Sequence, residues 1–349
     1  MRFLPSQEIM KNDFYKYQAQ TTPHPLAIEI SHAKGCYIYD IKGKEYLDFI
    51  AGVSASSLGH CHPKVISAVK NQLDKYLHVM VYGEFIQEPA VELTKLLSGL
   101  LPDNLTTTYL TNSGTEAIEG SMKLARRATG RKEIIYSKKA YHGNTMGALS
   151  IMGVEERKKI FQPLLPNCNS IEFNNEKDIL KITSKTAGVV LETIQGGAGF
   201  IVPKNNYLKK IKNRCSDVGA LLILDEIQPG FGRTGKLFGF EHYDISPDIL
   251  AIGKGMGGGM PIGAFTASKE LMSLLSNNPK LGHITTFGGH PVIASAALAT
   301  LKEITRTNLI EETLQKENIF RKHLVHPLIK EIRGKGLMLA LIVDTPEIA

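Results

Sequence analysis

Residues 221–226 read Leu-Leu-Ile-Leu-Asp-Glu, a short apolar run that ends on two carboxylates. Similar runs alternate with helical patterns through the middle of the chain, at residues 107–110, 133–136, 188–191, 249–252 and 263–266. Strands that are apolar on both faces need helices on each side of their sheet, so this alternation predicts an α/β fold with a mostly parallel sheet. Ligands of such sheets bind at the carboxyl ends of the strands, where we expect the functional site.

Towards its end the sequence changes to longer helical patterns. Residues 292–306 and 309–332 have helical periodicity, and residues 337–343 form a strand-like run. We therefore predict a large domain over residues 47–290 and a C-terminal small domain over residues 291–349, which the N-terminal segment, residues 1–46, joins. Because the sequence stops soon after the last run, we expect that strand to have little to pair with and the small domain to be incomplete.

The composition is that of a large soluble enzyme. The chain has 349 residues, of which 43% are hydrophobic, and can bury a sizeable core. No apolar run reaches the ~18 residues of a membrane span, and the first eleven residues lack the apolar core of a signal peptide. The four cysteines form no C-x-x-C pair, so neither a disulfide framework nor a zinc ribbon is indicated. We expect a cytoplasmic protein with no membrane partner.

The basic residues exceed the acidic ones, with a formal net charge of +7. No basic run is interleaved with aromatic residues, tryptophan is absent, and no helix-turn-helix or zinc-finger spacing occurs. This pattern favours anionic small molecules over nucleic acid as partners.

A Ser-Gly-Thr-Glu sequence at residues 113–116 follows one predicted strand and opens a predicted helix. Ser-x-x-Glu is a capping box, and capping alone would explain it. The alternative is phosphate binding, because Gly114 and Thr115 offer backbone N–H groups and a hydroxyl at the positive end of the helix.

Asp225 stands at the end of a buried strand, where an ionised carboxylate is costly without a partner. We therefore expect a cation beside it. A magnesium-binding Walker B aspartate is an alternative, but it requires G-x-x-x-x-G-K-[ST], and no Gly-Lys pair of this chain precedes Ser or Thr.

Residues 230–235 and 253–258 match the G-x-G-x-x-G fingerprint of dinucleotide sites. Such a site needs a helix directly after the fingerprint, and the glycine, proline and aromatic residues that follow both stretches prevent one.

Lys254 lies between two glycines directly after the run 249–252. Such a loop allows a large group to approach closely, although a lone lysine on a glycine loop is most often only solvated. Lys254 and Asp225 both follow strands. A lysine that forms a Schiff base and an aspartate that pairs with a pyridinium nitrogen are the protein's contribution to pyridoxal 5′-phosphate (PLP) chemistry.

Two further clusters contain histidine. Tyr141 and His142 follow the run 133–136, which places an aromatic ring to cover a planar cofactor, although packing of Tyr141 is the plain alternative. We include His142 among the cofactor-binding residues.

The sequence His60-Cys61-His62 lacks further ligands at i+3 or i+4, and adjacent side chains of a strand point apart. We therefore predict no metal site.

With these motifs in place, the chain resembles the class III PLP-dependent aminotransferases of the type I fold, the group of acetylornithine, ornithine and other ω-aminotransferases. The resemblance implies that Lys254 forms the Schiff base with PLP, that Asp225 pairs with the ring nitrogen, and that Gln228 binds the ring hydroxyl. Tyr141 and Ile227 would sandwich the ring. The motifs that carry the resemblance are residues 59–63, 113–117, 141–143, 225–228, 232–235, 253–263 and 286–289.

The same resemblance assigns the phosphate and the oligomeric state. Ser113, Gly114 and Thr115 would hold the phosphate, and Glu192 would lie near the cofactor. Thr286 is similar to the residue that reaches the phosphate of the neighbouring subunit, which implies a homodimer with shared active sites. The implied reaction is a ping-pong transfer of an amino group from an amino acid or ω-amine donor to an oxo acid, 2-oxoglutarate or pyruvate.

Departures from the family pattern concern the substrate. Asn144 occupies the position of an arginine that grips a substrate carboxylate in acetylornithine and ornithine enzymes. Gly197 and Val53 replace a glutamate and a tyrosine of ornithine enzymes, and His290 replaces a usual asparagine. The family's carboxylate-binding arginine of the small domain would lie beyond the end of this sequence. We therefore expect weak use of ornithine and acetylornithine.

Two other functions compete with transfer. A PLP-dependent aminomutase, racemase or decarboxylase could use the same scaffold and motifs. A non-catalytic α/β binding protein would leave the pairing of Lys254 with Asp225 unexplained.

Overall fold

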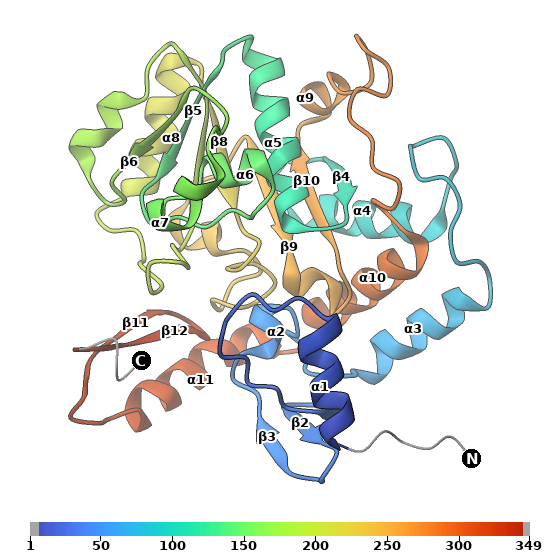
Figure 1. The fold of residues 1–349 in the computed structure, drawn as a ribbon. Coiled ribbons are helices and arrows are strands. Elements are labelled where there is room, and N and C mark those ends of the chain that lie inside the picture. The colour runs from blue at the N-terminus through green and yellow to red at the C-terminus, as the bar shows by residue number, and fades with distance from the viewer. Residues whose placement is uncertain (1–6, 345–349) are drawn as a thin grey trace.

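A computed structural model describes residues 7–344 of the chain (Figure 1). Its centre is a seven-stranded sheet with the order β4-β10-β9-β8-β7-β5-β6. Every neighbouring pair is parallel except the two that β10 makes, so the predicted mostly parallel sheet is confirmed. The strands are β4 (Thr107–Thr111), β5 (Glu133–Ser137), β6 (Cys168–Ile171), β7 (Thr186–Glu192), β8 (Leu221–Asp225), β9 (Ile249–Gly253) and β10 (Gly263–Ala267).

The central strands are buried on both faces, as their sequences require. Leu191 and Leu224 belong to one hydrophobic cluster, whereas Val190, the neighbour of Leu191, belongs to another. Successive side chains of a strand point to opposite faces, so the two clusters lie on the two sides of the sheet. Helix α5 (Gly114–Thr129) packs into the second cluster and α8 (Tyr207–Val218) into the first. The result is a three-layer arrangement of helices, sheet and helices.

Shorter helices and turns surround these layers. Among residues 7–344, no helix combines the length and the apolar character needed to cross a membrane. The remaining helices are α1 (Gln7–Tyr17), α2 (Ala51–Ser54), α3 (Pro63–Leu73), α4 (Glu88–Leu100), α6 (Met146–Ser150), α7 (Glu155–Lys158), α9 (Lys269–Ser273), α10 (Pro291–Arg306) and α11 (Leu309–His323), with 3₁₀ turns η1 (Lys159–Phe161), η2 (Glu176–Lys181), η3 (Gly239–Tyr243) and η4 (Lys254–Gly257).

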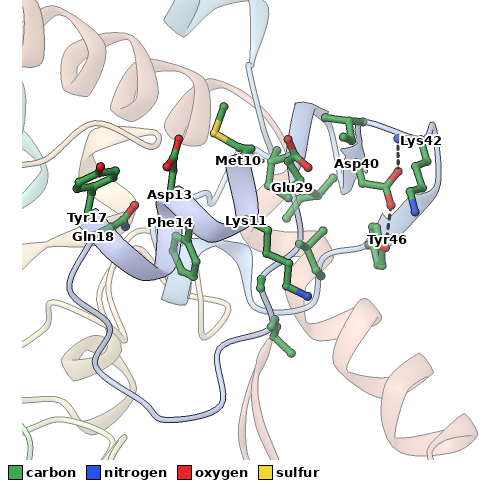
Figure 2. A pocket seen from close by; sticks show the side chains of 16 residues that line it. Met10, Lys11, Asp13, Phe14, Tyr17, Gln18, Glu29, Asp40, Lys42 and Tyr46 are labelled. Atoms are coloured by element: carbon green, nitrogen blue, oxygen red, sulfur yellow. Dashed lines mark hydrogen bonds between the residues drawn. The ribbon is translucent and has the colours of Figure 1, made fainter. Parts of the chain in front are cut away.

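The N-terminal segment forms a small antiparallel sheet of its own. Its strands are β1 (Ile30–Lys34), β2 (Tyr37–Asp40) and β3 (Glu45–Leu47). Helix α1 lies beside this sheet, and the two border a cavity of about 960 Å³ (Figure 2). Asp40 accepts hydrogen bonds from the hydroxyl of Tyr46 and from backbone N–H groups, which fixes the turn between β2 and β3.

The C-terminal part differs from the sequence-based prediction in two ways. The helix predicted over residues 309–332 ends at His323, because Pro327 lies within that range and a proline interrupts the helical hydrogen bonds. The following residues form strand β11 (Ile329–Lys335), which pairs antiparallel with β12 (Met338–Val343). The expectation that the last strand has little to pair with was therefore wrong.

Candidate active site

Three ionisable residues meet at the carboxyl ends of neighbouring strands. Glu192 ends β7, Asp225 ends β8 directly opposite it, and Lys254 follows the last residue of β9. They line one cavity of about 310 Å³, together with Gly114, Thr115, Tyr141, His142, Gly143, Asn144, Ile227, Gln228 and Pro229. The site thus lies where parallel sheets of this kind bind ligands.

Asp225 is held by two hydrogen bonds. Its Oδ2 lies 2.7 Å from Nδ1 of His142, and its Oδ1 accepts from the backbone N–H of Ile227 at 3.0 Å. Burial alone would lower the pKa of His142, but the hydrogen bond and charge of Asp225 raise it above its usual value. An ionised carboxylate only accepts, so Nδ1 of His142 carries a proton. His142 is thus a buried hydrogen-bond donor to Asp225, and its raised pKa favours the charged imidazolium beside the carboxylate.

The pKa values of Lys254 and Glu192 are both shifted in the direction that favours the neutral side chain. Burial lowers the pKa of Lys254, against the opposing charges of Asp225 and Glu192. Burial also raises the pKa of Glu192 to about 7, although its carboxylate accepts hydrogen bonds from the N–H groups of Gly196 and Tyr141. The cavity therefore contains an amine with a lowered pKa and a carboxyl group with a raised pKa. Shifted pKa values of this kind are frequent in functional sites.

The N-terminus of α5 faces the same cavity. Ser113 caps the helix, with its hydroxyl accepting from the N–H of Glu116 at 3.4 Å. The Glu116 carboxylate accepts from the N–H of Asn112 at 2.6 Å, so the predicted capping box is displaced by one residue on that side. A Cβ on Gly114 would lie 2.8 Å from Cδ1 of Ile227, so a larger residue here would push against the Ile227 side chain.

Not every residue predicted for the site lines this cavity. Ser113 acts as the helix cap, and Thr286 is exposed on the loop that precedes α10. Val53 belongs to α2 and is 59% exposed. A Cβ on Gly197 would lie 3.4 Å from Cβ of Tyr141, so Gly197 is next to the cavity without lining it. Asn144 does line it, and its Nδ2 donates to the Tyr141 hydroxyl at 3.3 Å.

The sequence analysis did not identify the interaction of His142 with Asp225, nor Ser54, whose Oγ accepts from Nε2 of Gln228 at 3.3 Å. No local pattern signals either contact, because each joins segments that are far apart in the chain. The histidines of the 60–62 cluster make separate contacts: His60 lies 2.8 Å from Asp48, and His62 lies 3.9 Å from Glu303.

The fold and this site define a PLP-dependent transferase of the type I fold. The chain belongs to the class III aminotransferases, whose family model matches residues 17–348. It is 37% identical to the acetylornithine aminotransferase of Methanopyrus kandleri over 335 residues, or 95% of this chain and 85% of the relative. It is 39% identical to a [LysW]-aminoadipate semialdehyde/glutamate semialdehyde transaminase of Sulfolobus acidocaldarius, covering 87% of this chain and 79% of that protein.

Solved structures agree with this assignment. An ornithine aminotransferase of Toxoplasma gondii superposes with a TM-score of 0.89 at 32% identity, covering 98% of this chain and 83% of that one. A taurine:2-oxoglutarate aminotransferase of Bifidobacterium kashiwanohense, solved with PLP and glutamate, gives a TM-score of 0.91 at 26% identity, covering 98% and 84%. The chain is accordingly an aminotransferase whose cofactor is PLP. The expectation from the sequence motifs is confirmed at this level.

The described residues fit PLP. The start of α5 presents open N–H groups to an anion, the close approach of Gly114 to Ile227 leaves no room for a side chain at this position, and an amine with lowered pKa lies in the same cavity.

Proposed function

We propose that Lys254 is the residue that binds PLP covalently and that its Nζ then moves a proton during amino-group transfer. The observation that carries this proposal is the position of Lys254 in one cavity with the Asp225–His142 pair. When bound, PLP supplies an electron sink for the substrate carbon. The lowered pKa of Lys254 suits a group that must accept and return that proton near neutral pH.

Asp225 and His142 form the charged support of the cofactor ring. Asp225 would face the ring nitrogen, while His142 keeps the carboxylate in place and balances its charge within a buried site. Tyr141 and Ile227 both line the cavity and would enclose the ring, and Gln228, hydrogen-bonded to Ser54, would bind the ring hydroxyl.

The phosphate would bind at the start of α5, on the N–H groups of Gly114 and Thr115 behind the Ser113 cap. Glu192, beside the cofactor, would be near its protonation midpoint at neutral pH.

A homodimer with shared active sites accompanies this proposal. Thr286 would reach the phosphate held by a second copy of the chain. Its loop exposes Leu281, Ile284 and Phe287, and the ring of Phe287 lies 4.8 Å from that of His78 in a segment with further exposed apolar residues. An apolar surface that joins two segments around a predicted shared site supports association of two chains.

The substrate would be an amino acid or ω-amine as donor and 2-oxoglutarate or pyruvate as acceptor. Near the cavity, Asn144 and Tyr141 present an amide and a hydroxyl that are bonded to each other, and Gly197 adds no side chain. An amide cannot replace the bidentate grip of a guanidinium on a carboxylate. A donor with one carboxylate or none is therefore favoured over ornithine and acetylornithine.

The test is Lys254→Ala. The variant should fold and lose amino transfer, because the removed amine is both the anchor and the proton carrier. The wild-type enzyme should release an oxo product in repeated turnovers only when an oxo acid acceptor is supplied, which separates transfer from mutase, racemase and decarboxylase chemistry. Substantial turnover by Lys254→Ala, or sustained turnover without an acceptor, would contradict the proposal.

A further inference from the structure

A second cavity, of about 680 Å³, lies between the N-terminal sheet, α11 and the β11–β12 hairpin. It shares no lining residue with the cofactor cavity. Its volume is in the range of small-molecule sites. Its walls are mainly aliphatic and aromatic side chains, among them Leu47, Phe49, Phe320, Leu324, Leu339 and Leu341.

One cation, Arg233, faces this apolar space without an acidic partner. Among the described side chains of residues 10–344, no carboxylate lies within 4.0 Å of its guanidinium, and the hydroxyl of Ser57 accepts a long hydrogen bond of 3.4 Å from Nη2. The Nε atom is buried and has no hydrogen-bond partner in the described part of the chain. Burial lowers the pKa of the guanidinium, which reflects the cost of this position.

The other charged groups of the cavity are already engaged. Asp48 lies 2.8 Å from His60 and accepts hydrogen bonds from the backbone N–H groups of Ile50 and Ala51. Asp48 therefore neither neutralises Arg233 nor attracts a second anion. A buried guanidinium is costly unless it is paired, and a carboxylate can satisfy it through two parallel hydrogen bonds.

We propose that this cavity is a binding site for an apolar monocarboxylate, with the carboxylate on Arg233 and the hydrocarbon tail against the leucine and phenylalanine walls. A dicarboxylate fits less well, because the described lining offers one unpaired cation and the Asp48 carboxylate. A medium-chain fatty acid has the required chemistry, since each methylene of its tail gains free energy when apolar walls remove it from water.

The ligand would lie next to the cofactor site but outside it. Residues 51–57 separate the two cavities: Ala51, Ser56 and Ser57 line the apolar one, and Ser54 accepts a hydrogen bond from Gln228 in the other. A Cβ on Gly255, the residue after Lys254, would lie 2.6 Å from the Ser57 hydroxyl, so this wall touches the loop that carries Lys254.

Cys36 gives a readout that does not depend on catalysis. Cys36 is exposed and lines the cavity, whereas Cys61 is also exposed and does not line it. In the PLP-loaded enzyme, saturating octanoate should slow the alkylation of Cys36 by iodoacetamide at least tenfold and leave the rate at Cys61 unchanged. Peptide mass spectrometry follows both residues in one sample. Octanamide, which has the same tail without the charge, should protect Cys36 at least tenfold less effectively.

The variant Arg233→Gln tests the ion pair. It should raise the octanoate concentration for half-protection of Cys36 at least tenfold, as expected for the loss of a charge-assisted hydrogen bond. Arg157→Gln removes an exposed arginine far from the lining and should not change it. Equal protection by octanoate and octanamide, or no protection of Cys36, would overturn the proposal even if Arg233→Gln failed to fold. If Cys36 does not react even without octanoate, the cavity is covered in the assembled enzyme. That result would also overturn the proposal.

Discussion

Replacing His142 by phenylalanine tests the charged support of the cofactor ring. His142 is fully buried, and its Nδ1 lies 2.7 Å from Oδ2 of Asp225. Phenylalanine keeps a ring of similar size, so the change removes the hydrogen bond and the charge without leaving a large cavity. In the variant, Asp225 would retain the backbone N–H of Ile227 as a donor.

The magnitude follows from the loss of one hydrogen bond to a buried carboxylate. Hydrogen bonds to charged groups contribute about 1.5–3 kcal/mol. If Asp225 supports the transition state through its position and charge, kcat/KM should fall by about 10- to 150-fold, because 1.36 kcal/mol corresponds to a tenfold change in rate. His142→Asn retains an N–H donor and should lose less activity than His142→Phe.

The assay is amino transfer with a fixed donor and acceptor at saturating PLP, together with the cofactor absorbance and the melting temperature of each variant. Saturating PLP separates a weaker cofactor affinity from a slower reaction. If His142→Phe binds PLP and transfers amino groups at the wild-type rate, the hydrogen bond does not support the reaction and His142 has only a packing role.

Two other changes test separate parts of the site, and a third tests Glu226, the buried residue that follows Asp225. Gly114→Ala should weaken PLP binding at least tenfold, since its Cβ would lie 2.8 Å from Cδ1 of Ile227; an unchanged PLP titration would contradict the phosphate assignment. Burial raises the pKa of Glu226 to about 7, so the folded state favours the protonated acid and loses on the order of 3 kcal/mol as pH rises from about 4.5 to 7. Between these pH values the melting temperature of Glu226→Gln should fall less steeply than that of the wild type. Equal slopes would contradict the raised pKa of Glu226. Asn144→Arg should raise kcat/KM for acetylornithine relative to a simple diamine; a wild-type preference for acetylornithine of a hundredfold or so, about 3 kcal/mol, would show that another arginine grips its carboxylate.

The sheet was predictable because its strands have a strong local signal. All six runs identified for the sheet are strands, and Glu192, Asp225 and Lys254 meet because each ends or directly follows a strand of that sheet. The edge strand β6, Cys168–Ile171, was missed because Cys-Asn-Ser-Ile has neither the apolar run of a central strand nor a strict alternation. The C-terminal helix was predicted too long because the helical periodicity of the sequence continues past Pro327. The helix itself ends at His323, since a proline cannot donate the backbone hydrogen bond that a helix requires.

Contacts between loops could not be predicted in the same way. The sequence indicates that the buried Asp225 needs a partner, but it does not say which side chain of the protein hydrogen-bonds to it. His142 does so because the loop after β5 passes the end of β8, and that path depends on the order β8-β7-β5 in the folded sheet. The same applies to Ser54, which reaches Gln228 across 174 positions of the chain.

The arrangement of the four ionisable side chains explains how a lysine can be reactive beside two carboxylates. If Glu192 and Asp225 were both ionised, their charges would hold Lys254 in its protonated form, which cannot attack or accept a proton. His142 offsets the charge of Asp225 through a direct hydrogen bond, and burial moves the pKa of Glu192 to about 7. Around neutral pH part of the Glu192 population is therefore uncharged, and the attraction that would keep the proton on Lys254 is weakened. Burial of Lys254 acts in the same direction, so the low polarity at the strand ends favours the neutral amine that the proposed role of Lys254 requires.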